Sequence, residues 1–209
     1  MSSTARSPDS LAITLLTLLL LGGAALLFLP GEEARAGGKE RIVVPAQLIH
    51  FDDGDSIDIR WRKEPESVRI IGIDTPEVQH LDHDLPYPQP FGQEAAGFLR
   101  GCIAVADKIE LLRSGKQDKY GRTLGYLFLD GKNYSVLAIR ARLAYGPNPR
   151  FGDNGLPEEY AACLAAAAAA GPVAFEEPWL YRKRMRKVAA WMKEQGTYPY
   201  QHAQQAEEK

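Results

Sequence analysis

The chain has 209 residues, of which 45% are hydrophobic and 25% are charged, and its formal net charge is -2. This composition is typical of a globular protein. It excludes a disordered chain, a collagen-like repeat and a disulfide-rich mini-protein. Because 27 acidic residues outnumber 25 basic ones, no chain-wide basic field favours nucleic acid. An anionic partner would have to be bound by a local arrangement of residues.

The succession of apolar, charged and patterned stretches predicts how the chain is organised. A long apolar run stands near the N-terminus, and the glycine-rich, charged residues after it are typical of a short linker. In chain order we expect an N-terminal tail (1–9), a transmembrane anchor or signal segment (10–31), a linker (32–40), a main domain (41–175), a basic amphipathic helix (176–195) and a polar tail (196–209).

The apolar run covers residues 11–29. At a rise of about 1.5 Å per residue, a helix of this length spans about 28 Å, close to the thickness of a bilayer. The length favours an uncleaved anchor, whereas Ala34-Arg35-Ala36 has the pattern of a signal-peptide cleavage site. Both alternatives place the domain outside the cytoplasm. It is either anchored to the membrane through residues 11–29 or secreted or periplasmic after cleavage near Ala36.

Two cysteines, Cys102 and Cys163, are too few for a thiolate metal cluster. Two alternatives stay open at this stage. In an oxidising compartment the two residues form one disulfide, and otherwise they are buried thiols that behave as small hydrophobic side chains.

Hydrophobic periodicity predicts short strands and helices from residue 41 onward. Strands are expected at residues 42–51, 56–61, 68–73, 109–112 and 123–129. Helices are expected at residues 92–106, 135–144 and 157–170, and a proline-rich loop at 79–91. Short strands with interleaved helices predict an α+β, mainly β fold. The specific expectation is a five-stranded OB-type β-barrel with about three helices.

The predicted C-terminal helix is basic and amphipathic. Its apolar residues Tyr181, Met185, Val188 and Met192 fall on one face. The rest of its surface is basic: Arg182, Lys183, Arg184, Arg186, Lys187 and Lys193. We favour a helix that docks on the barrel with a solvated basic face. The alternative is a helix that binds a phosphate-rich surface, either nucleic acid or anionic lipid.

Carboxylates occur at the ends of several predicted strands. Asp53 and Asp55 lie at one strand junction, and Asp74 and Glu77 follow another strand. Each motif alone is typical of a turn. If the four side chains gather at one rim of the barrel, they repel one another, and a hard cation with oxygen ligands would relieve that repulsion.

Two arginines accompany these carboxylates. Arg69 lies in the strand that leads to Asp74, and Arg122 opens a later strand after the turn that begins at Asp118. Guanidinium groups bind phosphate oxygens in a bidentate manner. A metal ion, a spare carboxylate and two arginines together suit phosphodiester hydrolysis, because they neutralise charge, activate water and stabilise the transition state.

Several motifs together resemble the thermonuclease (staphylococcal or micrococcal nuclease-like) family. They are DGDS at 53–56, VRIIGIDTPE at 68–77, FGQEAAGFL at 91–99, DKYGRTLGYLF at 118–128 and DGK at 130–132. The resemblance covers residues 43–144, roughly half of the chain. It implies a five-stranded OB barrel with helices and a Ca²⁺-dependent endonuclease that hydrolyses phosphodiester bonds of DNA and RNA.

The resemblance also implies the roles of individual residues. Asp55 and Asp74 would bind Ca²⁺ through their carboxylates and Thr75 through its backbone carbonyl. Glu77 would be the general base or would orient the attacking water.

The remaining implied roles concern the substrate. Arg69 and Arg122 would bind the scissile phosphate, and Lys119 and Tyr120 would contact a terminal phosphate of the bound nucleotide. Supporting positions fall to two further acids, Asp53 beside the metal and Asp118 in its loop.

The sequence departs from the family pattern at Ser56, where a threonine is usual, and at Ser135, where an asparagine is common. The alternative function is a non-catalytic nucleic-acid or protein-binding module on the same fold, attached to a membrane. A third interpretation makes the basic C-terminal helix the active element of a membrane-attached surface protein. The substrate is the expected macromolecular partner, and no protein partner is predicted.

Overall fold

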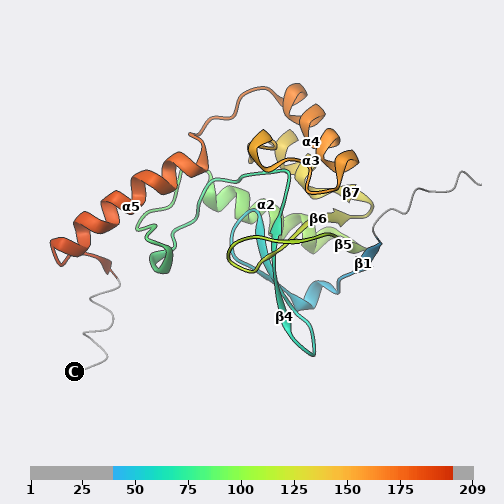
Figure 1. The fold of residues 1–209 in the computed structure, drawn as a ribbon, viewed down its shortest axis with the longest axis horizontal. Coiled ribbons are helices and arrows are strands. Elements are labelled where there is room, and N and C mark those ends of the chain that lie inside the picture. The colour runs from blue at the N-terminus through green and yellow to red at the C-terminus, as the bar shows by residue number, and fades with distance from the viewer. Residues whose placement is uncertain (1–39, 200–209) are drawn as a thin grey trace, which may run out of the picture. The chain divides into compact units, whose positions relative to one another are not determined.

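A computed structural model of the chain describes residues 40–199 (Figure 1). The tail, anchor or signal segment and linker expected at the N-terminus lie outside the described residues, except Glu40, and so do residues 200–209. The described part of the chain has a mixed α+β fold with one sheet of seven strands and four α-helices.

The strands are β1 (Arg41–Val43), β2 (Ile49–Phe51), β3 (Ser56–Arg60), β4 (Pro65–Ile70), β5 (Ile109–Gln117), β6 (Thr123–Leu129) and β7 (Lys132–Asn133). The α-helices are α2 (Gly92–Val105), α3 (Tyr134–Arg140), α4 (Pro157–Ala170) and α5 (Pro178–Glu194). Three short 3₁₀ helices are η1 (Ala46–Leu48), η2 (Leu81–His83) and η3 (Pro149–Phe151). Among residues 40–199, no helix is both long enough and apolar enough to cross a bilayer.

The sheet has the strand order β1-β5-β6-β4-β3-β2, and β7 pairs with β6. All neighbours are antiparallel except β4 and β6, which are parallel. In this register Arg69 of β4 lies opposite Ser56 of β3 on one side and Leu124 of β6 on the other. Three segments that are far apart in the sequence therefore meet around Arg69.

The five predicted strands become seven because one predicted strand is divided in two and one further short strand follows the last. The segment expected as one strand at 42–51 is divided by Pro45, which has no amide hydrogen for a ladder, and by η1. Its two halves, β1 and β2, stand at opposite ends of the strand order. The added strand β7 forms because Asp130 and Gly131 adopt positive φ angles of 48° and 75° and reverse the chain after β6.

Two other element boundaries differ from the predicted ones because of local backbone geometry. The strand expected at 68–73 is β4, which begins earlier and ends at Ile70, because the chain then enters a bend around Gly72. Gly72 has a φ of 81°, and a Cβ there would lie 2.7 Å from Tyr126 Cε1. The helix expected at 135–144 ends earlier, as α3, and Arg142 adopts a φ of 58°.

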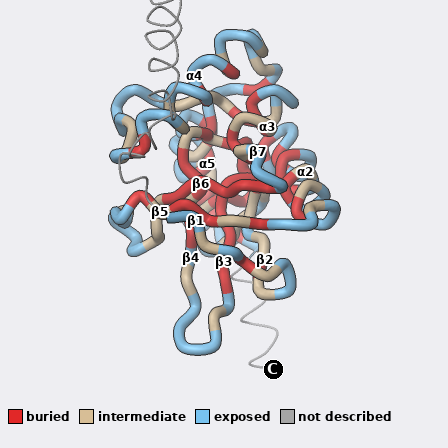
Figure 2. The backbone as a smooth tube through the Cα atoms, turned by 90° about the vertical axis from the view of Figure 1, so that its right-hand side faces the viewer, coloured by how far each residue is buried: buried red, intermediate tan, exposed pale blue. Residues whose placement is uncertain are grey.

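The hydrophobic core lies between the sheet and helices α2, α3 and α4 (Figure 2). Ile59 of β3, Leu111 of β5 and Leu127 of β6 are fully buried, as are Leu99 of α2 and Cys163 of α4. Cys163 and the half-buried Cys102 are free thiols, which agrees with the second alternative for the cysteines. Burying such apolar side chains stabilises the fold by about 1.5–3 kcal/mol each.

Helix α5 docks on the loop at 79–91 and not on the sheet. Tyr181 and Met185 pack against Leu85 in a small cluster of their own. The Tyr181 hydroxyl donates to the backbone oxygen of Tyr87 at 2.9 Å. The prediction of an amphipathic helix is confirmed, but the surface that it covers is a loop whose position the sequence did not predict.

Glu66 of β4 provides a test of fold stability outside the site. Its carboxylate accepts hydrogen bonds from Arg113 Nε at 2.7 Å and from Trp61 Nε1 at 2.8 Å. The hydrogen bonds from Arg113 hold the pKa of Glu66 below its usual range. A carboxyl group whose pKa is lowered by folding stabilises the protein above its unfolded-state pKa. That stability is lost as the pH falls through the folded-state pKa.

Replacing Glu66 with glutamine should therefore lower the free energy of unfolding by about 1 kcal/mol near pH 7, a modest value because solvent screens this partly exposed pair. The loss should shrink at an acidic pH below the folded-state pKa of Glu66, where the wild-type carboxyl is protonated. Urea unfolding at both pH values measures this difference. An equal loss at both pH values would mean that shape and not charge explains the effect.

Candidate active site

The turn between β2 and β3 carries the first carboxylates of the site. Asp55 is only 1% exposed, and its Oδ2 accepts a hydrogen bond from the amide of Thr75 at 2.8 Å. The amide of Asp55 donates to Asp53 Oδ1 at 2.9 Å, and the Tyr134 hydroxyl donates to the backbone oxygen of Gly54 at 2.8 Å. The turn is thus fixed from both sides, and Asp53 has a supporting position.

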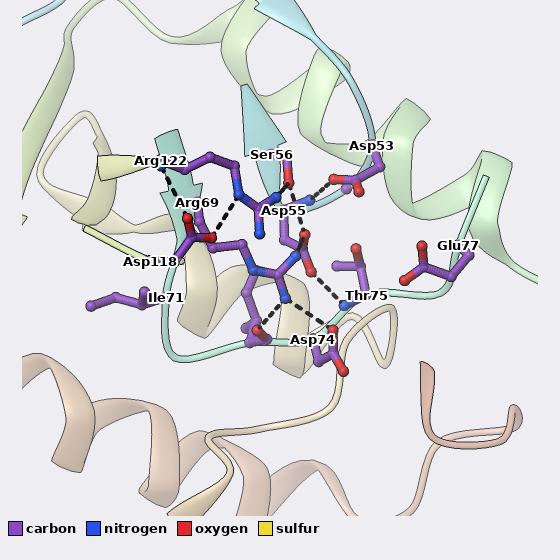
Figure 3. Close-up of polar contacts among 12 residues, drawn as sticks. Asp53, Asp55, Ser56, Arg69, Ile71, Asp74, Thr75, Glu77, Asp118 and Arg122 are labelled. Carbon is purple, nitrogen blue, oxygen red and sulfur yellow. Dashed lines mark hydrogen bonds and ion pairs between the residues drawn. The ribbon is translucent and has the colours of Figure 1, made fainter. Parts of the chain in front are cut away.

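Arg69 connects the two carboxylates that are expected to bind metal. Its Nη1 donates to Asp55 Oδ1, and its Nη2 donates to Asp74 Oδ1 at 2.9 Å. Figure 3 shows Asp55 and Asp74 pointing toward the same guanidinium from separate loops. Although Asp74 is remote from Asp55 in sequence, the two side chains converge on one positively charged group. Charge neutralisation of this kind is what a buried acidic cluster requires.

A buried serine holds the loop that presents Asp74. Ser135 of α3 is fully buried, and its hydroxyl donates to the backbone oxygen of Ile71 at 2.8 Å. Two backbone hydrogen bonds also join the loop to Tyr145. The amide of Asp74 donates to the backbone oxygen of Tyr145 at 3.2 Å, and the amide of Tyr145 donates to the backbone oxygen of Asp74 at 2.9 Å. Ser135 stands where the family commonly has an asparagine, and its hydroxyl therefore holds the loop through a hydrogen bond of its own.

The turn between β5 and β6 presents the second predicted arginine. Arg122 Nε donates to Asp118 Oδ2 at 2.8 Å, and Arg122 Nη1 donates to Ser56 Oγ at 3.2 Å. Asp118 also accepts the amides of Tyr120 and Arg122, at 2.9 and 3.0 Å. Although partial burial opposes the effect, these hydrogen bonds hold the pKa of Asp118 below its usual range. Asp118 thereby braces the loop and orients Arg122.

Lys119 and Tyr120 lie at the tip of this turn. Tyr120 is 67% exposed, and Lys119 Nζ lies 4.8 Å from the centre of its ring. No hydrogen bond or ion pair links these two side chains to the carboxylates among the residues that the structure describes. They stand at the edge of the site, where a substrate group would have to reach them.

Glu77 is buried beside the start of α2. Its amide donates to Gln89 Oε1 at 3.2 Å, while its backbone oxygen accepts a hydrogen bond from the amide of Gln89 at 2.8 Å. Gly92 must lack a side chain, because a Cβ there would lie 2.1 Å from the backbone oxygen of Glu77. Burial raises the pKa of Glu77 to about 7, although Arg182 opposes the shift. Gln89 was not predicted, and it lies in the proline-rich loop where the sequence has no periodic signal.

A third arginine completes the site and was also not predicted. Arg182 of α5 donates from Nη1 to Glu77 Oε1 and from Nη2 to Asp74 Oδ2, the latter at 3.3 Å. It is separated from Glu77 by 105 residues and links Glu77 to Asp74. The basic composition of α5 was the available signal. Nothing in it indicates which of the basic side chains turns toward the carboxylates.

The oxygen donors of the site suit a hard cation. No group of three or more His, Cys, Asp or Glu side chains within residues 40–199 is arranged to hold a metal ion. The predicted set needs only two carboxylates, Asp55 and Asp74, and the Thr75 carbonyl. The first two converge on one positive charge, and the buried Thr75 Oγ1 has no hydrogen-bond partner in the described part of the chain. Such a set of oxygen donors fits Ca²⁺.

This arrangement of arginines and carboxylates, at the ends of inner strands of a mixed sheet, is chemically suited to binding and hydrolysing phosphodiesters. Comparison with known proteins agrees with it. The family model described as staphylococcal nuclease homologue matches residues 67–168, so this part of the chain is similar to that family. The mixed sheet is consistent with the OB-like fold expected for it.

Curated relatives give the same result. Thermonuclease of Staphylococcus intermedius is 36% identical over 104 residues, which are 47% of this chain and 60% of the relative. Endonuclease YncB of Bacillus subtilis is 28% identical over 121 residues, 55% of this chain and 56% of the relative. An uncharacterized protein of Bacillus anthracis is 35% identical over 104 residues, 49% of this chain and 46% of the relative. The chain spans about half the length of these relatives.

Proposed function

We propose that this protein is a calcium-dependent endonuclease that hydrolyses phosphodiester bonds of DNA and RNA. The observation that carries the proposal is the pair of carboxylates, Asp55 and Asp74, joined through Arg69, with the buried Glu77 nearby. A module that only binds nucleic acid has no use for a buried carboxylate beside such a set. The names of the nuclease relatives support the same activity.

The proposed mechanism assigns the phosphate to the arginines. Arg69 lies in β4 and Arg122 lies directly before the neighbouring strand β6, and a phosphate oxygen can replace their present carboxylate and hydroxyl partners. Asp118 holds Arg122 in that orientation through Nε. Arg122 then stabilises the negative charge that develops on the phosphate and on the departing oxygen.

The remaining residues act on water and metal. Glu77 accepts a proton from the attacking water or orients it, and Gln89 and Gly92 fix the backbone that carries Glu77. Asp55, Asp74 and the Thr75 carbonyl would hold Ca²⁺, which supplies positive charge to the phosphate. Lys119 and Tyr120, at the exposed tip of the β5–β6 turn, would contact a terminal phosphate.

Calcium dependence provides the direct test. The full chain should hydrolyse single-stranded DNA and RNA with added Ca²⁺ and should lose this activity with a chelator. Because the protein offers few ligands, half-maximal activity is expected at about 10⁻⁴–10⁻³ M Ca²⁺. Mg²⁺ should substitute poorly, since its smaller shell demands tighter octahedral geometry. Full activity with Mg²⁺ and chelated calcium would contradict the metal assignment, and no hydrolysis under any condition would favour the binding module.

We further propose that the domain lies outside the cytoplasm, where calcium is abundant. It would be anchored through residues 11–29 or released after cleavage near Ala36. Protease added to intact cells should digest the anchored protein, and released protein should begin at Gly37. Protein found in the cytosol, or protected from protease until the cells are lysed, would contradict the location.

A further inference from the structure

Helix α5 is held in a defined position beside the active site. Besides the contact between Tyr181 and Tyr87, the Tyr198 hydroxyl donates to the backbone oxygen of Leu81 at 2.7 Å. Lys193 near the end of the helix donates to Asp84. With these anchors on the loop at 79–91, Arg182 reaches Asp74 and Glu77. The helix therefore begins next to the site and runs away from it (Figure 1).

Two further side chains lie on the same face of α5 as Arg182. Trp179 precedes Arg182 by three residues and Arg186 follows it by four, so all three lie on one face of the helix. Trp179 is 45% exposed, Arg186 is exposed, and the Arg182 side chain is 28% exposed. We call these three residues the α5 stripe. It extends over about 10 Å at 1.5 Å per residue, the length of about three stacked nucleotides.

The charge of α5 is local and unusual for this chain. The protein as a whole carries a net charge of -2, yet no acid occurs between Pro178 and Lys193. Three of the basic residues form ion pairs with acids: Arg182 with Asp74 and Glu77, Arg184 with Glu176, and Lys193 with Asp84. Within residues 40–199 the structure gives no ion pair to Arg186. The Arg186 guanidinium group can therefore bind an anionic group of a ligand that extends from the active site.

We propose that the α5 stripe is an additional binding site for a nucleic-acid strand, which receives the nucleotides that flank the scissile phosphate. This inference rests on the proposed function and adds a second part of the protein surface that binds the polynucleotide substrate. Arg182 exchanges its carboxylate partners for a backbone phosphate, and Arg186 binds a phosphate further along. Trp179 stacks on a base, as aromatic side chains do in sequence-tolerant single-strand sites.

Binding can be measured separately from hydrolysis. Fluorescence anisotropy of the full chain with Ca²⁺ would use phosphorothioate oligothymidylates, which keep their charge and resist cleavage. The two probes are a dinucleotide and a strand of about 8 nucleotides, within the site size of an OB-fold. The longer strand should bind more tightly. Because no cleavage is needed, failure of the proposed nuclease activity and failure of this inference give different results.

Matched variants on the same helix test the stripe. Arg186→Glu should weaken binding of the longer strand about 10-fold and reduce the slope of log affinity against log salt by about 0.7. Lys187→Glu changes the charge equally but points about 100° away, and it should weaken binding less than about 3-fold. Trp179→Ala should weaken binding about 5- to 100-fold, the effect of one lost stacking contact, whereas Trp191→Ala on another face should not.

Two outcomes would overturn the proposal. Equal weakening by Arg186→Glu and Lys187→Glu would mean that diffuse charge and not the stripe attracts the strand. Loss of binding to phosphatidylserine vesicles by Arg186→Glu, with unchanged oligonucleotide binding, would assign the helix to a lipid surface instead.

Discussion

Replacing Glu77 with glutamine should lower the rate of phosphodiester hydrolysis by about 10²–10⁴, the range for loss of a positioned general base. Glutamine keeps the shape of Glu77 and an oxygen that accepts from Arg182, so the fold should be retained. Initial rates on single-stranded DNA at saturating Ca²⁺ measure the effect. The Kd of a nucleotide with Ca²⁺ should change little, because Glu77 is not among the residues assigned to bind either.

The matched control is Glu158→Gln, which removes an exposed carboxylate at the start of α4. That variant should keep the wild-type rate. An unchanged rate in Glu77→Gln would remove Glu77 from the mechanism. A loss of rate accompanied by a lowered thermal midpoint would instead assign Glu77 a structural role as the partner of Arg182.

Replacing Arg122 with lysine should lower kcat by about 10²–10³, the usual cost of removing one group that stabilises transition-state charge. Arg122 uses Nε to bind Asp118 while Nη1 reaches Ser56. A lysine has a single nitrogen and cannot hold both positions, although it keeps the charge. Steady-state kinetics on single-stranded DNA should show the loss mainly in kcat.

Arg100→Lys in α2 makes the same change at an exposed position and serves as the control. It should leave kcat unchanged. Near-wild-type turnover by Arg122→Lys would refute the assignment of the Arg122 guanidinium group to the scissile phosphate. A loss confined to KM would place Arg122 in substrate binding alone.

Elements whose boundaries are set by neighbouring residues in the sequence were predicted well. Helix α4 covers residues 157–170 as expected, because Pro157 starts it and Gly171, with a φ of 72°, ends it. Strand β6 also has the predicted limits, 123–129. The first strand was predicted wrongly, because both of its halves have strand-like residues and only their pairing with β5 or β3 separates β1 from β2.

The candidate site shows the same division. Motifs that stand at strand ends predicted the carboxylates and Arg69 and Arg122, because adjacent strand ends meet in space whatever the intervening loops do. Gln89 and Arg182 were not predicted. Each lies in a segment without a local signal for its orientation, and each reaches Glu77 only after the loop at 79–91 and α5 have packed together.

The sequence by itself determined the types of residue at the site, the order of most elements and the family that the central region resembles. Such information is local, since propensity, capping and motif spacing act over a few neighbouring residues. The tertiary structure alone decided that α5 packs on the loop at 79–91 and that Arg182 bridges Asp74 and Glu77. That contact joins segments 105 residues apart, and it forms because apolar burial of Tyr181 and Met185 fixes which side of the basic helix faces the carboxylates.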